Sequence, residues 1–154
     1  IIVSSIIFVP LNLNVIKFVN NAASWEEAIL YIDNEKNDLP IFYTNSLAET
    51  RNKEFVLNPK NRSYLTAQLS IFDDNISQNV NMLFAITESN LKENKQILIN
   101  SISDQNLFII REYSFDKKTT WDHFNKMIDE ISCEIEYYKQ FLDVYAGKFI
   151  CKSL

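Results

Sequence analysis

Short apolar runs separated by segments with helical periodicity constrain the fold of this chain more than any other feature. Residues Ile41–Thr44, Val80–Ile86 and Leu107–Ile110 predict three strands, and Val144–Cys151 predicts a last one. The run at Leu107–Ile110 is almost continuously apolar, as expected of a strand with both faces covered. Because the predicted strands alternate with predicted helices, the sequence indicates an α/β fold: a layered, mostly parallel sheet flanked by helices.

One helix is predicted before the first strand and another between the second and third strands. Ser24 and Glu27 have the spacing of a capping box, in which the serine hydroxyl accepts from the Glu27 amide while the Glu27 side chain reaches back. Four apolar residues of this segment share one helical face: Trp25, Ala28, Ile29 and Ile32. Thr87 can cap a second helix that ends near Ile102.

The longest helix is predicted to begin at Thr119 or Thr120, where Asp122 suits the positive first turn. Its apolar side chains recur at alternating spacings of three and four residues, which is the helical pattern. They are Trp121, Phe124, Ile128, Ile131, Ile135, Tyr138 and Leu142. The pattern predicts one continuous helix that extends to the last strand.

Composition limits the class of protein. A length of 154 residues with 47% hydrophobic content suits one domain that buries about 70% of the surface of its unfolded chain. The net charge is −5 and the Lys and Arg residues are scattered, so nucleic acid is not an expected partner. Gly147 is the only glycine and lies in the last predicted strand, which excludes glycine-rich phosphate cradles of the Rossmann or P-loop type.

The two cysteines, Cys133 and Cys151, are too few to define a disulfide framework. They could pair with each other, but two buried free thiols are the favoured interpretation. The sequence therefore leaves both the pairing and the redox compartment open.

The sequence opens directly with an apolar run, Ile1–Pro10, without the initiating Met and the basic region that open a signal peptide. A signal peptide would carry positive charge there, and a full membrane span needs about 20 residues. A core strand and the cut end of a transmembrane helix both remain, and the helix end is the favoured interpretation. We therefore divide the chain into residues 1–20, the end of a membrane helix with its juxtamembrane segment, and residues 21–154, a soluble α/β domain.

Residues with catalytic potential are few. His123 is the only histidine, and a surface histidine is favoured over a catalytic one because the sequence places no nucleophile beside it. One histidine and two distant cysteines give poor zinc-ligand spacing, so no metal and no cofactor are predicted. Asp73 and Asp74 precede Asn75 and are interpreted as turn-forming residues rather than as a cation site.

Ser46 and Glu49 share a turn directly after the first predicted strand, a place where α/β enzymes often carry functional residues. A nucleophile elbow would need glycines beside the serine, and Asn45 and Leu47 flank it instead. The favoured interpretation is a second capping box, with Ser46 as the N-cap and Glu49 three residues later. The same turn, extended to Arg51, is our candidate contact surface for a partner.

Four aromatic residues could form a platform on which a sugar ring stacks. They are Tyr113, Phe115, Tyr137 and Tyr138. Packing in the core or at its rim is the favoured interpretation for each of them.

Several segments together resemble a known family. They comprise a tryptophan-containing helix, a strand with a Ser–Glu turn, an Asn-Pro loop and a Tyr-Leu segment. The segments are Trp25–Ala28, Pro40–Glu49, Asn58–Pro59, Tyr64–Leu65 and Leu69–Ser70, followed by a strand ending in Arg111 and a helix with Trp121. In these features the chain resembles the soluble C-terminal portion of bacterial multi-spanning glycosyltransferases of the GT-C type. That family includes lipid A aminoarabinose transferases and protein mannosyltransferases, which take sugars from polyprenyl-phosphate carriers.

The resemblance implies a membrane-associated domain on the extracytoplasmic, periplasmic side. Its partners would be the membrane part of the same enzyme and, through the complete enzyme, the lipid-linked sugar donor; the sugar, the acceptor and the oligomeric state stay open. The catalytic acidic residue of such enzymes lies in an early loop between membrane helices, so no catalytic residue is expected in this chain. Ser46, Glu49 and Arg51 would contact the membrane part or the acceptor.

Two alternatives remain at this point. The first is a non-catalytic α/β binding or interaction module, secreted or membrane-tethered, with no transferase attached. The second is a small hydrolase that uses Ser46 or Asp73, which would require a pocket with a base within hydrogen-bond reach.

Overall fold

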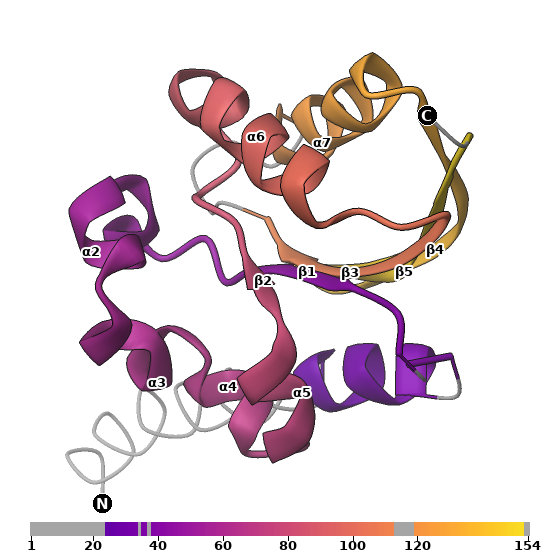
Figure 1. Cartoon of the computed structure of the whole chain (residues 1–154). Coiled ribbons are helices and arrows are strands. Elements are labelled where there is room, and N and C mark those ends of the chain that lie inside the picture. The colour runs from indigo at the N-terminus through magenta and orange to yellow at the C-terminus, as the bar shows by residue number, and fades with distance from the viewer. Residues whose placement is uncertain (1–23, 34, 37, 113–118, 153–154) are drawn as a thin grey trace, which may run out of the picture.

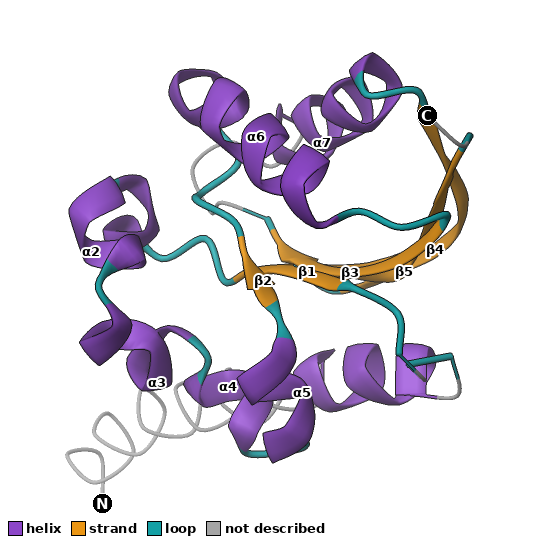
Figure 2. Cartoon of the chain, in the orientation of Figure 1, coloured by secondary structure: helices purple, strands orange, loops and turns teal. Residues whose placement is uncertain are grey.

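The computed structural model describes residues 24–33, 35, 36, 38–112 and 119–152, which form one sheet with helices on both faces (Figures 1 and 2). The strand order is β2-β1-β3-β5-β4. The strands are β1 (Ile41–Thr44), β2 (Asn81–Met82), β3 (Gln105–Arg111), β4 (Cys133–Phe141) and β5 (Val144–Cys151). The predicted α/β layering is therefore confirmed.

The sheet is mostly antiparallel, so the prediction of a mostly parallel sheet is wrong. β1 is parallel to β2 and β3, whereas β5 runs antiparallel to both of its neighbours, β3 and β4. Only Leu142 and Asp143 separate β4 from β5, and Leu142 has a φ of 55°. A turn this short can join only antiparallel strands, because a parallel pair needs a crossover of a dozen or more residues.

The helices divide between the two faces of the sheet. In chain order they are a helix over residues 24–33, α2 (Lys53–Leu57), α3 (Arg62–Leu65), α4 (Ala67–Ser70), α5 (Asp74–Asn79), α6 (Leu91–Ser101) and α7 (Thr119–Glu130). Short 3₁₀ turns cover Ala48–Arg51, Pro59–Asn61 and Glu88–Asn90. Figure 1 shows α6 and α7 over one face, with α4, α5 and the helix over residues 24–33 under the other.

Each face of the sheet has its own apolar core, because neighbouring residues of a strand point to opposite sides. On β1, Tyr43 packs against Trp25 with ring centroids 5.8 Å apart. Phe42 faces the other way and packs against Phe149 of β5, also at 5.8 Å. The predicted inner face of the first helix is confirmed, since all four of its apolar residues are buried: Trp25, Ala28, Ile29 and Ile32.

The prediction of the longest helix is wrong for its second half. α7 begins at Thr119 as predicted but ends at Glu130, and the residues after it form β4. Ser132 has a φ of 62°, a left-handed conformation that stops a helix. Beyond it, Cys133 and Ile135 face the core while Glu134 is exposed. A spacing of four residues is also two steps of a strand, so the apolar pattern alone could not separate the two structures.

The strand predicted over Val80–Ile86 is shorter than expected. Only Asn81 and Met82 join the ladder as β2, although Leu83 to Ile86 are buried. The main chain of Phe84 is bound instead by the side chain of Asn94, whose Oδ1 accepts from the Phe84 amide at 2.8 Å while its Nδ2 donates to the Phe84 carbonyl at 3.2 Å. A side chain from α6 thus replaces a neighbouring strand.

The predicted membrane-helix end, residues 1–20, lies outside the described residues. Within the described part of the chain, none of the helices combines the length and the hydrophobicity that crossing a membrane requires.

Candidate functional site

The carboxyl ends of β1 and β3 form the switch point of the sheet. Between β1 and β2 the chain passes through α2 to α5, of which α4 and α5 lie under one face, and between β2 and β3 it passes through α6 over the other face (Figure 1). β1 and β3 are parallel neighbours, so their carboxyl ends lie side by side. In open α/β sheets this is the position at which ligands bind most often.

Ser46 lies at this switch point, but it is turned into the protein. It is only 7% exposed, and its Oγ donates a hydrogen bond of 2.5 Å to the carbonyl oxygen of Arg111 at the end of β3. Ser46 has a φ of 48°, and the short 3₁₀ turn that follows is entered through Leu47 without a side-chain cap. The predicted capping box from Ser46 is therefore wrong, because its hydroxyl joins two strand ends instead.

Asn45 fixes the same turn, and our sequence interpretation did not single it out. Its Nδ2 donates to the carbonyl of Leu65 at 2.7 Å, and its Oδ1 accepts from the Leu47 amide at 3.1 Å. The Tyr43 hydroxyl donates to the same Leu65 carbonyl at 3.2 Å, and burial raises the pKa of Tyr43. The signal in the sequence is an asparagine directly after an apolar strand. In the structure its amide is fully buried, and a buried amide needs partners.

Glu49 and Arg51 lie further along the turn and nearer to the surface. The Glu49 carboxylate accepts from the Tyr64 hydroxyl at 3.5 Å, which links the turn to α3. Arg51 is exposed, as is Tyr64 at 52%. The structure thus brings Glu49 and Arg51 to one accessible surface and separates Ser46 from them by burial.

A second polar cluster lies at the end of β3. The Arg111 Nε donates to the Asp143 carboxylate at 2.7 Å, and the Glu112 amide donates to the Asp143 carbonyl at 2.7 Å. Glu112 is only 7% exposed. Burial raises the pKa of Tyr145, and the neighbouring charge of Glu112 raises it further. These interactions tie the β4–β5 hairpin to the switch point.

Of the remaining sequence candidates, Asp73 has structural partners, whereas the buried Nδ1 of His123 has no hydrogen-bond partner among the described residues. Asp73 caps α5 by accepting from the Ile76 amide at 2.9 Å and pairs with Lys36 at 2.6 Å, which agrees with its interpretation as a turn-forming residue. His123 is half-buried on the first turns of α7. Ser46 donates to a main-chain carbonyl rather than to a base, and nothing in this geometry activates it as a nucleophile.

Cys133 and Cys151 form a disulfide, so the favoured interpretation of two free thiols is wrong. The two residues lie directly opposite each other on β4 and β5, with Cα atoms 4.0 Å apart. The sequence could not show this pairing, because it depends on β4 being a strand. The bond joins the first residue of β4 to the last of β5.

The predicted aromatic platform is only partly within the described residues. Tyr113 and Phe115 lie outside them. Tyr138 is 49% exposed and packs against Trp121 at 4.4 Å, and Trp121 in turn stacks on Tyr145 at 4.7 Å. Packing at the rim of the core is thus confirmed for Tyr138.

No protein-family model, curated protein sequence or solved structure matches this chain. The family resemblance rests on the residues quoted above. Within the described ranges, no group of three or more His, Cys, Asp or Glu side chains could hold a metal ion.

Proposed function

We propose that this chain is the extracytoplasmic C-terminal domain of a membrane glycosyltransferase that transfers a sugar from a polyprenyl-phosphate carrier. The catalytic residues would lie in the membrane part, and this domain would shape the acceptor entrance above it. The observation that carries the proposal is that three segments of the family resemblance, although separate in sequence, pack against one another: the tryptophan helix, the strand with its turn and the Tyr-Leu segment.

The packing of these segments is specific. Trp25 of the first helix contacts Tyr43 of β1, and the Tyr43 hydroxyl and the Asn45 amide both bind the carbonyl of Leu65. Next to Leu65, Tyr64 reaches back to Glu49. The tryptophan helix, the strand with its turn and the Tyr-Leu segment therefore support one another, which is what a shared structural unit requires.

The disulfide supports the proposed compartment. Disulfides persist mainly in oxidising environments such as the bacterial periplasm and are rare in reducing ones. The bond between Cys133 and Cys151 thus agrees with a domain on the extracytoplasmic side.

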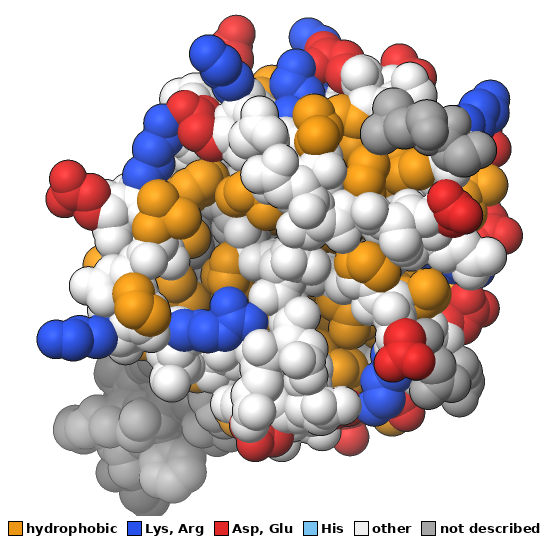
Figure 3. Space-filling view, in the orientation of Figure 1, with side chains coloured by type: hydrophobic (Ala, Val, Ile, Leu, Met, Phe, Trp, Pro, Cys, Tyr) orange, Lys and Arg blue, Asp and Glu red, His pale blue; other side chains and the backbone are white. Residues whose placement is uncertain are grey.

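The surface around Glu49 and Arg51 is the proposed contact with the membrane part. Exposed apolar side chains lie beside it, with Leu57 of α2 at 68% exposure and Tyr64 of α3 at 52%. Figure 3 shows apolar side chains interspersed with Lys and Arg over the region of α2 and α3. Such a mixed surface suits a contact with another protein segment near lipid head groups.

The coding sequence upstream of residue 1 provides the first test. We expect many hydrophobic spans ahead of this domain, as in the complete transferases. A single span or a signal sequence would overturn the transferase assignment and leave the binding module.

Sugar transfer by the complete enzyme provides the second test. We expect Glu49→Ala and Arg51→Ala to lower the transfer rate by about tenfold, the effect of losing about 1.4 kcal/mol. Glu54→Ala is the matched control, because Glu54 is an exposed carboxylate on the adjacent α2. Unchanged rates and unchanged folding in both variants would remove the contact surface from the proposal.

A non-catalytic binding module, secreted or tethered, is the second candidate function. The observation that favours it is a polar cavity formed entirely by this chain, which could bind a ligand without a transferase. The same upstream sequence separates the two candidates.

A further inference from the structure

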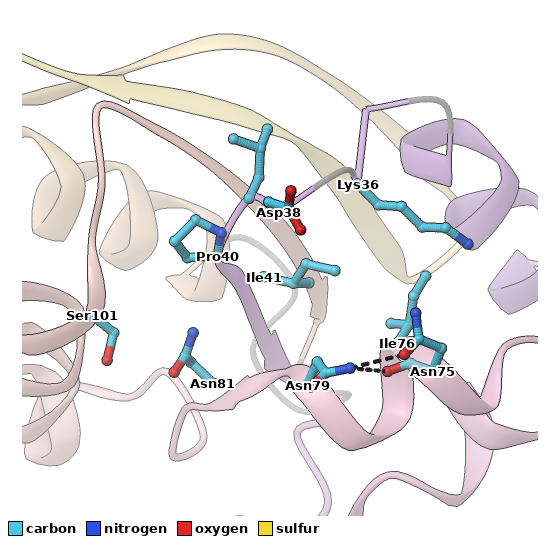
Figure 4. Close-up of a pocket in the computed structure, with 10 residues that line it drawn as sticks. Lys36, Asp38, Pro40, Ile41, Asn75, Ile76, Asn79, Asn81 and Ser101 are labelled. Carbon is cyan, nitrogen blue, oxygen red and sulfur yellow. Dashed lines mark hydrogen bonds between the residues drawn. The ribbon is translucent and has the colours of Figure 1, made fainter.

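A cavity of about 520 Å³ lies at the end of the sheet opposite to the Ser46 turn. It is bounded by residues 38–41, which lead into β1, by α5, by β2 and by the last residue of α6 (Figure 4). Its size lies in the usual range for small-molecule sites. Three separate stretches of the sequence therefore meet around one space.

Neutral polar side chains supply much of the lining. Asn75 and Asn79 come from α5, Asn81 from β2 and Ser101 from α6. Pro40 and Ile41 add an apolar part, and Figure 4 shows them between Ser101 and Asn81 on one side and Asn75 and Asn79 on the other.

Several of these polar groups are available to a ligand. Among the described residues, the side chains of Asn81 and Ser101 have no hydrogen-bond partner, and neither does the carboxylate of Asp38. Asn79 is oriented by its neighbour, because its Nδ2 donates to the Oδ1 of Asn75 at 3.0 Å. The side-chain oxygen of Asn79, Oδ1, thus remains as an acceptor at the edge of the cavity.

The charges around the cavity do not favour an anion. The Lys36 ammonium group pairs with Asp73 at 2.6 Å and also with Asp33. The hydrogen bonds that the ammonium group donates, first to Asp33 and then to Asp73, raise the pKa of Lys36. Asp38 is the remaining charged group in the lining, and it is negative. A phosphate or carboxylate would therefore meet repulsion.

We propose that this cavity binds a neutral, polyhydroxylated ligand of about one sugar unit. Adjacent ring hydroxyls would donate to Asp38 and to the Asn79 oxygen, while the Asn81 amide and the Ser101 hydroxyl donate and accept. Pro40 and Ile41 would pack against the C–H groups of the ring. That the ligand is a sugar of the acceptor rests on the proposed function, whereas binding of a neutral polyol rests on the cavity alone.

The test is a titration of the 154-residue chain, uniformly labelled with ¹⁵N, followed by two-dimensional NMR. The probes are mannose, arabinose, N-acetylglucosamine and inorganic phosphate. We expect at least one sugar to bind with a Kd in the millimolar range and to shift the amide signals of Asp38, Asn79 and Asn81. Phosphate should leave these signals unchanged.

Two variants locate the site. We expect Asn81→Ala and Ser101→Ala each to weaken binding by about tenfold, because each removes one hydrogen bond to the ligand. Asn100→Ala is the matched control, since Asn100 is exposed on α6 next to Ser101 but outside the cavity. The spectrum of each variant also reports whether it is folded.

Three results would overturn the proposal: no shift with any sugar, shifts confined to another surface, or binding that both variants leave unchanged. Phosphate binding at the same signals would overturn the neutral character of the ligand. None of these results bears on the transferase assignment, which depends on the upstream membrane spans. Conversely, a chain without those spans that still binds a sugar here would keep the site and lose the proposed function.

Discussion

Position 147 requires a glycine, because the neighbouring strand leaves no room for a side chain. It lies in β5 opposite Phe108 of β3 and Tyr138 of β4. A Cβ atom added to it would lie 2.2 Å from the carbonyl oxygen of Tyr137 and 2.7 Å from the Tyr138 Cα. Both are main-chain atoms, and the register of β4 shifts between Ile135 and Tyr137, just where this close approach occurs.

We expect Gly147→Ala to lower the free energy of unfolding by about 3 kcal/mol, because the backbone of β4 has to move to admit a methyl group. Urea-induced unfolding followed by circular dichroism measures this change. Ser63→Ala, an exposed position on α3, is the control and should stay within about 0.5 kcal/mol of the parent. Parent-like stability of Gly147→Ala would contradict the close approach of the two strands.

Asn94 stabilises the fold through the hydrogen bonds of its side chain. It is fully buried, and it binds both the amide and the carbonyl of Phe84. We expect Asn94→Ala to destabilise the protein by about 3 kcal/mol, because two buried main-chain groups lose their partners. Asn100→Ala on the exposed side of the same helix serves as the control in the same urea experiment. Equal stability of the two variants would show that the Phe84 backbone finds other partners.

At the residue scale, the sequence predicted burial better than it predicted hydrogen bonds. Helical periodicity alone predicts that Trp25 and Ile32 lie in the core, and both are buried. Local spacing predicts that Ser46 caps its own turn, yet its hydroxyl donates to the carbonyl of Arg111, which is 65 residues away. A polar side chain selects its partner from all segments that the fold brings near, and local spacing contains no information about those segments.

At the scale of whole elements, β4 shows how a sequence pattern can fit two structures. Its residues continued the helical spacing of α7, and the predicted helix included them. The structure instead ends the helix at Glu130 and uses Ser132 at positive φ to start a strand that pairs with β5. Strand pairing depends on a partner later in the chain, so it overrides a local preference for helix.

The N-cap of α5, Asp73, should make the stability of the protein depend on pH. Burial acts to raise the pKa of Asp73, but hydrogen bonds from Lys36 and the Ile76 amide outweigh it and hold the pKa below its ordinary value of 3.8. A carboxyl whose pKa is lower in the folded state adds stability above the unfolded value, and this stability is lost as pH falls through the folded pKa. The contribution is therefore complete at neutral pH and absent in strong acid.

Asp73→Asn tests this, because asparagine is an equally good N-cap but carries no charge. We expect the variant to be about 1 kcal/mol less stable than the parent at pH 7, with the difference vanishing as pH falls through the folded pKa of Asp73. Urea unfolding at a series of pH values measures it, with Asp104→Asn, an exposed position before β3, as the control. A difference that is constant across pH would assign the loss to the cap rather than to the Lys36 pair.

At the scale of the whole molecule, the sequence predicted the layers but not the direction of the strands. Apolar runs and helical faces were enough for a sheet covered on both sides. The antiparallel half of the sheet follows from the β4–β5 hairpin, and that hairpin was hidden inside the predicted helix. The candidate turn was located correctly after β1, but which of its side chains face outward depends on the packing of Leu65 and Arg111 against it.

The disulfide cross-links β4 and β5, the hairpin that the helical pattern of the sequence does not predict. Cys133 and Cys151 are 18 residues apart, and a cross-link over a loop of that length contributes about 3 kcal/mol to stability. We expect Cys133→Ser/Cys151→Ser to lower the free energy of unfolding by this amount. Adding a reductant should shift the urea midpoint of the parent and leave the double variant unchanged.

The same bond links the fold to the proposed compartment. Protein that is exported to an oxidising compartment should show no free thiols when it is alkylated without reduction and analysed by mass spectrometry. Protein kept in a reducing cytosol should be alkylated at both cysteines and be less stable.

Loss of the bond should first release the Cys133 end of β4, because this strand lies at the edge of the sheet. Faster hydrogen exchange at that end would report the release. Equal stability of the oxidised and reduced proteins would mean that the strand pairing alone holds the hairpin. Free thiols in the exported protein would remove the support that the bond gives to an extracytoplasmic domain.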